Sequence, residues 1–227
     1  MGGAASGAVY AVNCIHYYNF APTNPECFDP LRLDYCCTTA VSANSHNITN
    51  APLLIDPAGG NFRLQSNSPC INAGKNAYVF SGTDLDGNPR IVGGTVDIGA
   101  YEFQTPASVI SYAWLQQYGL PIDGSADYTD PDADGMNNWQ EWRCGTDPTN
   151  VTSVLRLLSP TGGVSGVTVK WQSVTTKSYY VQRSTNLIAQ SAFSTLKSNI
   201  VGQSVTTTYA DTSATNRIPY FYRVGVQ

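Results

Sequence analysis

Three aspartates stand at alternate positions in one short stretch, Asp130, Asp132 and Asp134, and Gly135 follows them directly. Three carboxylates so close in sequence repel one another unless a cation lies among them. Ca²⁺ is a hard cation that takes about six to eight oxygen ligands, and carboxylates and backbone carbonyls suit it. The stretch therefore predicts a calcium site, and a solvated acidic turn is the alternative.

The spacing matches a twelve-residue calcium loop that begins at Asp130. Acids occupy positions 1, 3 and 5, glycine allows the sharp turn at position 6, and an acid at position 12 can bind with both oxygens. Asp127 and Asp147 flank the loop and could add ligands or cap its ends. The predicted ligands are Asp130, Asp132, Asp134, the backbone carbonyl of Met136, Asn138 (directly or through a water) and Glu141.

A second group of acids, Asp84, Asp86 and Asp97, could also hold a metal ion. A structural role is the expectation, however. Asp86 and Gly87 form a turn dipeptide, and Asp97 is expected to accept backbone N–H groups.

No catalytic constellation is evident in this chain. The only histidines are His16 and His46, too few to argue a zinc site of two or three histidines, and neither has a nucleophile motif near it. Catalysis by acids would need two carboxylates within about 10 Å in a groove. We therefore expect a protein that is not an enzyme.

The six cysteines allow fifteen pairings. Adjacent residues of a strand point to opposite faces, so Cys36 and Cys37 should have different partners. Cys70 is expected to pair with one of them and Cys14 with the other, in an order that the sequence leaves open. The remaining cysteines are Cys27 and Cys144.

Composition and charge exclude several classes of protein. Only 12% of the residues are charged, the net charge is −4, and the 12 Lys and Arg are scattered, which argues against a nucleic-acid footprint. The longest apolar runs are too short to span a membrane. Cysteines together with a calcium loop indicate an oxidising, extracellular or cell-surface location. No signal peptide is visible, so we expect the C-terminal piece of a longer secreted protein.

Residues 1–104 contain short strand-like runs with Asn or Gly at their corners and no helical periodicity. Such runs are typical of a solenoid, in which each coil is buried only by stacking on its neighbours. This segment resembles bacterial right-handed parallel β-helix proteins, and its end resembles their choice-of-anchor Q region. The resemblance implies the terminal coils and cap of a β-helix, with an open end that could self-associate. The matching stretches are 13–19 (NCIHYYN), 35–39, 47–57, 61–64, 68–74 (SPCINAG), 83–90 (TDLDGNPR) and 96–103 (VDIGAYEF).

Residues 105–153 are predicted to form a helix, a polar connector, the calcium loop and a short second helix. Apolar residues recur at intervals of three and four over 107–118, and Gly119 ends that pattern. Stretches 114–120, 130–142 and 145–150 resemble the thrombospondin type 3/dockerin-like calcium units of bacterial secreted proteins. Cellulosomal dockerins carry two such loops and this chain has one, so cohesin binding is not expected. Trp114, Trp139 and Trp142 are expected to form a small core.

Residues 154–227 are predicted to form a β-sandwich of six or seven strands. Apolar residues alternate at Val167, Val169 and Trp171, and turn residues punctuate the segment at sandwich-like spacing. Stretches 182–187 (QRSTNL) and 220–224 (YFYRV) resemble fibronectin type III-like C-terminal domains. The predicted fold is thus mainly β, with a β-helix end, a short helical calcium-binding connector and a C-terminal sandwich.

The predicted function is a non-catalytic, calcium-binding C-terminal region of an extracellular surface or adhesion protein. The alternative is a glycan-binding accessory region of a polysaccharide-degrading β-helix enzyme. Tyr17, Tyr18 and Tyr35 could stack on sugars, although stacking on one another is the simpler role. A cell-surface or extracellular polysaccharide is accordingly the candidate partner.

Overall fold

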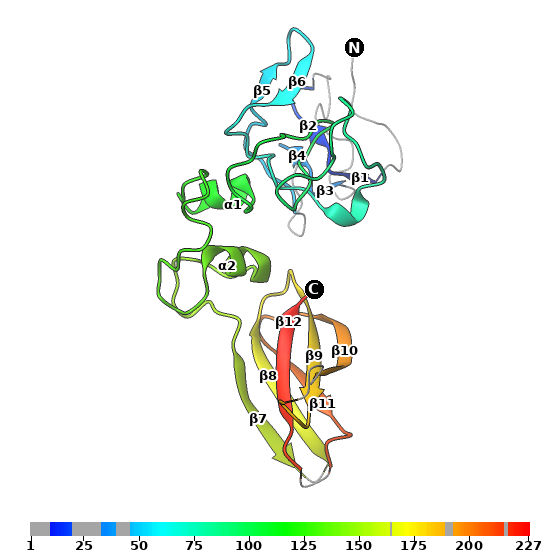
Figure 1. Ribbon diagram of the computed structural model, residues 1–227, viewed down its shortest axis with the longest axis vertical. Helices are drawn as coiled ribbons and strands as arrows, with labels where there is room; N and C mark the ends of the chain where they lie inside the picture. Colours follow the sequence, from blue (N-terminus) through cyan, green and yellow to red (C-terminus); the bar gives the residue numbers. More distant parts are fainter. Residues whose placement is uncertain (1–9, 20–32, 40–45, 164, 189–192, 216–217) are drawn as a thin grey trace. The chain divides into compact units, whose positions relative to one another are not determined.

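A computed structural model describes residues 10–19, 33–39, 46–163, 165–188, 193–215 and 218–227 (Figure 1). The protein is mainly β, with few helices. It divides into two compact units, Met1–Thr129 and Asp130–Gln227. Within the described ranges, no helix has the length and apolar character needed to cross a membrane.

Where the structure describes it, the first unit contains short strands, a single turn of 3₁₀ helix and one α-helix. The strands described here form two-stranded sheets, with a few isolated bridges beside them, so backbone pairing alone holds little of this unit together. Its elements are β1 (Ala11–Val12), β2 (Ile15–His16), β3 (Leu33–Asp34), β4 (Cys37–Thr38), β5 (Leu54–Asp56), β6 (Asn61–Leu64), η2 (Asn76–Tyr78) and α1 (Tyr112–Gln117).

Strands β1 and β2 pair in parallel with β3 and β4, each residue with the one 22 positions later. The corner between the two strands repeats with the same offset: Asn13 and Tyr35 both have a positive φ, of 55° and 50°. A third parallel bridge joins Cys37 to Ile48. Successive passes of the chain therefore lie side by side in register, and β5 and β6 then form an antiparallel pair.

The core of this unit brings together side chains from distant parts of the sequence. Ile15 and Ile48 pack against it from the parallel strands, and Ile122 from the segment after α1. The segment between the strands and Thr129 is thus part of the same packed unit. The buried residues of this core are Cys37, Leu54, Leu64, Cys70, Ile71, Ile98 and Tyr112.

Helix α1 is shorter than the helix predicted over residues 107–118. The Ala107 N–H donates to the Tyr112 hydroxyl, and the Val109 N–H donates to the Asp127 carboxylate. The first N–H groups of a helix have no partner within it, so these two bonds do not prevent a helix. The Tyr112 N–H, however, donates to the Ile71 carbonyl and not to the Ser108 carbonyl four residues before it, so the α-helix starts only at Tyr112. The sequence pattern does not reveal this competition, because Ile71 lies far earlier in the chain.

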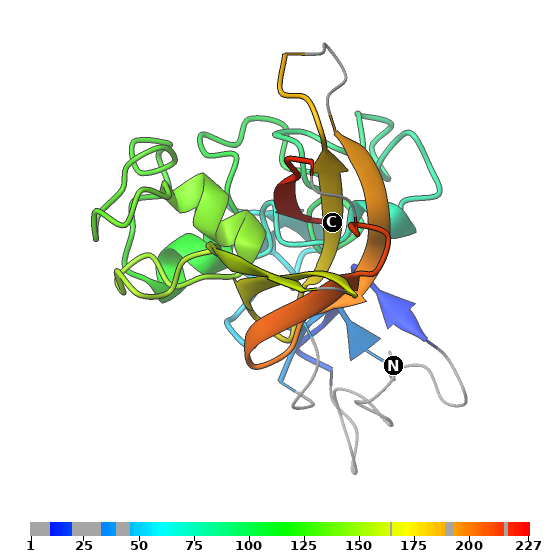
Figure 2. The same cartoon turned by 90° about the horizontal axis from the view of Figure 1, so that it is seen from below.

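The second unit contains α2 (Asn138–Cys144) and six strands (Figure 1, and from below in Figure 2). The strands form two antiparallel sheets with the orders β11-β8-β7 and β10-β9-β12. The strands are β7 (Leu157–Gly163), β8 (Gly166–Ser173), β9 (Ser178–Ser184), β10 (Ser194–Val201), β11 (Val205–Asp211) and β12 (Phe221–Val226).

One hydrophobic core joins the two sheets. Val169 and Trp171 of β8 and Tyr179 and Val181 of β9 are buried in it, and residues of β10, β11 and β12 pack around them. Burial alternates along β8, as the sequence predicts. A polar link joins the sheets as well, because the buried Asp211 of β11 accepts hydrogen bonds from Arg183 of β9 and Tyr222 of β12.

The two-sheet core makes a matched pair of valine substitutions informative. Val181 is fully buried, whereas Val201 is 67% exposed. Val181→Ala should lower the free energy of unfolding of this unit by about 2 kcal/mol, because it removes the equivalent of two buried methylene groups and leaves a cavity. Val201→Ala should change it by less than about 0.5 kcal/mol. Urea unfolding measures both, and equal effects would contradict the assignment of the core.

Candidate metal centre

The acidic loop leads directly into α2, and local hydrogen bonds fix the start and the end of that helix. The Asn137 side chain accepts from the Gln140 N–H while the Gln140 side chain accepts from the Asn137 N–H, which is a complete capping box. Gly145 ends the helix in the left-handed conformation, with φ 74°. The helix thus has a defined register relative to the loop before it.

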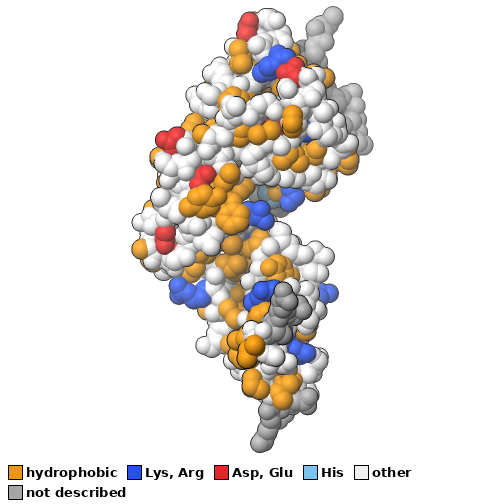
Figure 3. Space-filling view, in the orientation of Figure 1, with side chains coloured by type: hydrophobic (Ala, Val, Ile, Leu, Met, Phe, Trp, Pro, Cys, Tyr) orange, Lys and Arg blue, Asp and Glu red, His pale blue; other side chains and the backbone are white. Residues whose placement is uncertain are grey.

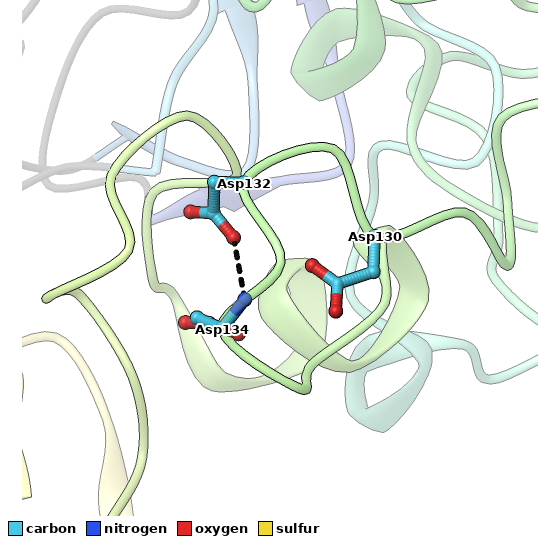
Figure 4. A group of neighbouring side chains, drawn as sticks. All are labelled: Asp130, Asp132 and Asp134. Atoms are coloured by element: carbon cyan, nitrogen blue, oxygen red, sulfur yellow. Dashed lines mark hydrogen bonds between the residues drawn. The ribbon is translucent and has the colours of Figure 1, made fainter.

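Asp130, Asp132 and Asp134 lie on one turn of this loop (Figure 4). Each offers a carboxylate oxygen, and the three oxygens lie within 4.8 Å of one another. No other group of three or more His, Cys, Asp and Glu residues in the described ranges meets this criterion. The three carboxylates of the predicted loop therefore lie close enough together to share one metal ion, and their role as calcium ligands stays a prediction.

Backbone N–H groups of the loop bind one oxygen of each aspartate. The Gly135 N–H donates to Asp130 Oδ2 at 3.0 Å, and the Met136 N–H donates to Asp134 Oδ1 at 2.7 Å. The Asp134 N–H donates to Asp132 Oδ1 at 3.2 Å, the bond drawn in Figure 4. The second oxygens of Asp132 and Asp134 are buried and receive no hydrogen bond from the protein.

The turn that carries these acids needs two left-handed residues. Gly135 has φ 96°, which glycine adopts at no steric cost, and Ala133 has φ 62°, which is strained for a residue with a Cβ atom. Glycine at the sixth position of the loop is what the calcium-loop pattern requires.

Glu141 projects from the first turn of α2 and is the most unusual residue of the site. Its exposed fraction is 0%, and no hydrogen-bond donor reaches either carboxylate oxygen. Burial, followed by the charges of Asp132 and Asp134, raises the pKa of Glu141 to about 7. Thr146 lies close enough to lower that pKa in part, but its hydroxyl bonds the backbone carbonyl of Glu141.

The two other predicted ligands, Asn138 and Met136, lie at the start of α2 and just before it. Asn138 is the first residue of α2 and is fully buried, and Met136 lies one residue before the helix cap. The Met136 sulfur accepts from the Leu155 N–H at 3.3 Å, which connects the loop to the segment before β7. The loop therefore contacts the strand-bearing part of its own unit.

The acids that flank the loop are occupied elsewhere. Asp127 accepts from the Ser108 hydroxyl at 2.6 Å and from the Val109 N–H at 3.0 Å. Asp147 accepts from the backbone and the hydroxyl of Thr149. Both aspartates therefore have structural partners, which favours capping over metal binding.

The second acidic group of the sequence forms a hydrogen-bonded network. Asp84 accepts from the N–H groups of Asp86, Asn88 and Glu102, and Asp97 accepts from those of Asn72 and Phe103. Sequence reasoning missed the centre of this network, the ion pair between Arg90 and Glu102, whose atoms lie 2.6 Å apart. The Arg90 guanidinium also donates to the Gly99 carbonyl. Arg90 ends the stretch 83–90 and Glu102 lies in the stretch 96–103, but nothing in either stretch indicates that the two residues pair.

The three tyrosines considered for sugar stacking pack against neighbouring rings of the protein. Tyr17 and Tyr18 meet edge to face, with an interplanar angle of 74°. Tyr35 stacks on His46, whose Nδ1 lies 2.8 Å from Asp34. In the described part of the first unit the three tyrosines therefore do not make a coplanar row. On the face shown in Figure 3, Lys and Arg side chains lie in several separate places, one of them beside an acidic side chain.

A cavity of about 180 Å³ lies in the second unit, between the residues that follow α2 and the first sheet. Cys144, Tyr179 and Val205 are among its lining residues, and the lining includes no Asp, Glu, Lys, Arg or His. It is smaller than the usual ligand pocket of about 300–1,000 Å³.

No family model matches this chain, and searches of curated proteins and of solved structures find no match to it either. The family resemblances of the three segments therefore remain predictions.

One acid in the hydrogen-bonded network of the first unit, Asp97, has an unusually high pKa. Burial and the charge of Glu102 raise the pKa of Asp97 to about 7, whereas an unfolded aspartate titrates near pH 3.9. Between these values the folded state binds the extra proton, so this group makes the unit less stable as pH rises from about 4 to 7.

Carbon-13 NMR of the Asp97 carboxyl carbon should give a midpoint near pH 7. Exposed Asp123 is the control, because the hydrogen bonds from Ser125 lower its pKa. An Asp97 midpoint below that of Asp123 would contradict the assignment.

Proposed function

We propose that this chain is a non-catalytic, calcium-binding region of an extracellular surface or adhesion protein. The observation that carries the proposal is the Glu141 carboxylate, which is fully buried without a donor to either oxygen. An unpaired buried charge costs several kcal/mol. A cation held between Glu141 and the three aspartates removes that cost, because it supplies the missing charge and occupies the missing coordination positions.

The donors favour calcium over other common ions. All of them are oxygens, which disfavours zinc, since zinc prefers nitrogen and sulfur ligands. One oxygen from each aspartate, the Met136 carbonyl, both oxygens of Glu141 and either Asn138 or a water give about seven ligands, the coordination that Ca²⁺ favours. Mg²⁺ demands near-octahedral geometry and keeps several waters, so it fits this donor set less well.

The calcium ion would serve a structural role. The loop and α2 bury little apolar surface apart from their contacts with the rest of the unit, so the charge balance among their acids decides how firmly they fold. Bound calcium would fix the loop against α2 and, through Met136 and Leu155, against the segment leading to β7. Sites of this kind suit the high calcium concentration outside cells, which supports an extracellular location.

For the first unit we propose the terminal coils and cap of a right-handed parallel β-helix. The parallel pairs with a common offset of 22 residues, and the matching left-handed corners at Asn13 and Tyr35, support this interpretation. The two antiparallel sheets of the second unit support a fibronectin type III-like sandwich. An accessory region with this architecture would act by stabilising or attaching its parent protein. Binding to a polysaccharide remains the alternative.

Replacement of Glu141 by glutamine should affect the stability of the calcium-free protein and that of the calcium-bound protein differently. Without calcium, Glu141→Gln should raise the melting temperature, because a neutral amide is cheaper to bury than an unpaired carboxylate. With calcium, the wild-type protein should gain stability, by about 2.7 kcal/mol at a concentration one hundred times Kd. The variant should bind calcium at least about tenfold more weakly, since it loses the bidentate ligand.

Isothermal titration calorimetry and thermal unfolding measure these effects. Asp123→Asn is the control, because it removes one acid from an exposed turn outside the loop. Equal calcium affinity in wild type and Glu141→Gln would contradict the proposed site.

Removal of calcium should also expose α2 to proteolysis. Chymotrypsin should cleave after Trp139 and Trp142, which are half-buried in α2, at least about tenfold faster in EDTA than in calcium, because the charge repulsion then opens the loop. Phe80 is 93% exposed in the first unit, and cleavage after it should proceed at the same rate in both conditions. Identical rates at both tryptophans would show that the helix folds independently of calcium.

A further inference from the structure

Cys14 and Cys36 occupy equivalent positions on neighbouring passes of the chain. The strands on either side of them pair in parallel with an offset of 22 residues, and the same offset places Cys14 opposite Cys36. The Cys37 N–H donates to the Cys14 carbonyl at 2.9 Å and the Cys36 thiol donates to the Ala11 carbonyl at 3.4 Å, so the two passes are held together at these cysteines. Each thiol also shifts the pKa of the other. Neighbouring strands lie about 4.8 Å apart, and disulfides span Cα separations of about 4.4–6.8 Å.

Cys37 has a different neighbour. It is fully buried, as is Cys70, and both belong to the hydrophobic core of the first unit. The Cys37 side chain is close enough to the Cys70 thiol to raise its pKa. The Ile98 N–H donates to the Cys70 carbonyl, so Cys70 is held against the segment that contains Asp97 and Glu102. Adjacent Cys36 and Cys37 therefore serve two separate thiol pairs.

We propose that these pairs are sites of disulfide formation and that the bridges are Cys14–Cys36 and Cys37–Cys70. The first bridge would join two successive passes of the chain. The second would join the later pass to the residues that precede the Arg90–Glu102 network. This assignment selects one order from the two that the sequence leaves open. These four cysteines are free thiols in the structure.

The first pair is prepared for thiol–disulfide exchange with a low-molecular-weight disulfide as the oxidant. Hydrogen bonds from Cys36 and then from His16 lower the pKa of Cys14, so Cys14 is the attacking thiolate. Its sulfur bonds to one sulfur of the oxidant and releases the other as a thiolate. Cys36 then loses its proton, attacks the Cys14 sulfur and releases the second thiolate. The protein loses two electrons and two protons, and the oxidant becomes two thiols.

The second pair would be oxidised in the same way, but it lies deeper. The neighbouring Cys37 side chain, followed by burial, raises the pKa of Cys70, so it supplies little thiolate. Cys14 is half-buried, whereas Cys37 and Cys70 are both fully buried. The Cys14–Cys36 bridge should therefore form first when folded, reduced protein meets the oxidant.

Both bridges would stabilise a unit whose strands are only two to four residues long. A bridge between residues 14 and 36, or between 37 and 70, closes a loop of the unfolded chain and so reduces its conformational entropy. None of these cysteines belongs to the acidic loop. The proposal is thus independent of calcium binding, and either can fail alone.

The pairing can be read by mass spectrometry after equilibration with reduced and oxidised glutathione and alkylation of the remaining thiols. No common protease cuts between Cys36 and Cys37, so wild-type protein alone would not distinguish the two orders. Single variants do so, in a background of Cys27→Ser and Cys144→Ser that prevents exchange with other thiols. Cys36→Ser should retain the Cys37–Cys70 bridge and leave Cys14 alkylated. Cys37→Ser should retain Cys14–Cys36 and leave Cys70 alkylated.

Cys14→Ser and Cys70→Ser repeat the test from the opposite partners, so a variant that fails to fold does not decide the result. In the parent background, oxidation should raise the melting temperature by at least about 5 °C. A Cys14–Cys37 or Cys36–Cys70 bridge would overturn the pairing. Complete alkylation of all four cysteines after equilibration with oxidised glutathione would overturn the proposal as a whole.

Discussion

The acidic loop and α2 depend on how the charge of one buried carboxylate is balanced. Glu141 has no exposed surface and no donor, and the nearby Asp132 and Asp134 make its charged form still less favourable. The capping box and Gly145 fix the two ends of the helix that carries it, so the backbone of Glu141 has a defined place beside the loop. An oxygen-ligated cation satisfies all four acids at once, and this is the physical basis of the calcium proposal.

The two units are stabilised by different means. The second unit has long antiparallel strands around a core of Trp171, Tyr179 and valines, an arrangement in which apolar burial dominates. The first unit has very short strands, so many of its backbone N–H groups have no acceptor in a sheet. The carboxylates of Asp84, Asp97 and Glu102 accept hydrogen bonds from such groups. Disulfide bridges would suit such a unit, since its regular secondary structure contributes little to its stability.

The features that could be predicted well from the sequence are those set by residues close together in the chain. The loop acids, Gly135 and the start of α2 follow from spacing within twelve residues, and the alternation in β8 follows from its own residues. Long-range pairings were not predictable in the same way. The neighbour of Cys36 and the late start of α1 depend on residues far away in the chain, and the contact of Arg90 with Glu102 joins two stretches whose residues do not indicate a pairing. Periodicity in a single sequence carries no information about such contacts.

The most direct test of the central claim is a crystal structure of the protein grown with calcium, with anomalous scattering measured at long wavelength. We expect one strong anomalous peak at the acidic loop, about 2.3–2.6 Å from six or more oxygens, including both oxygens of Glu141. No peak there, with the Glu141 oxygens instead bonded to protein donors or to water alone, would contradict the account.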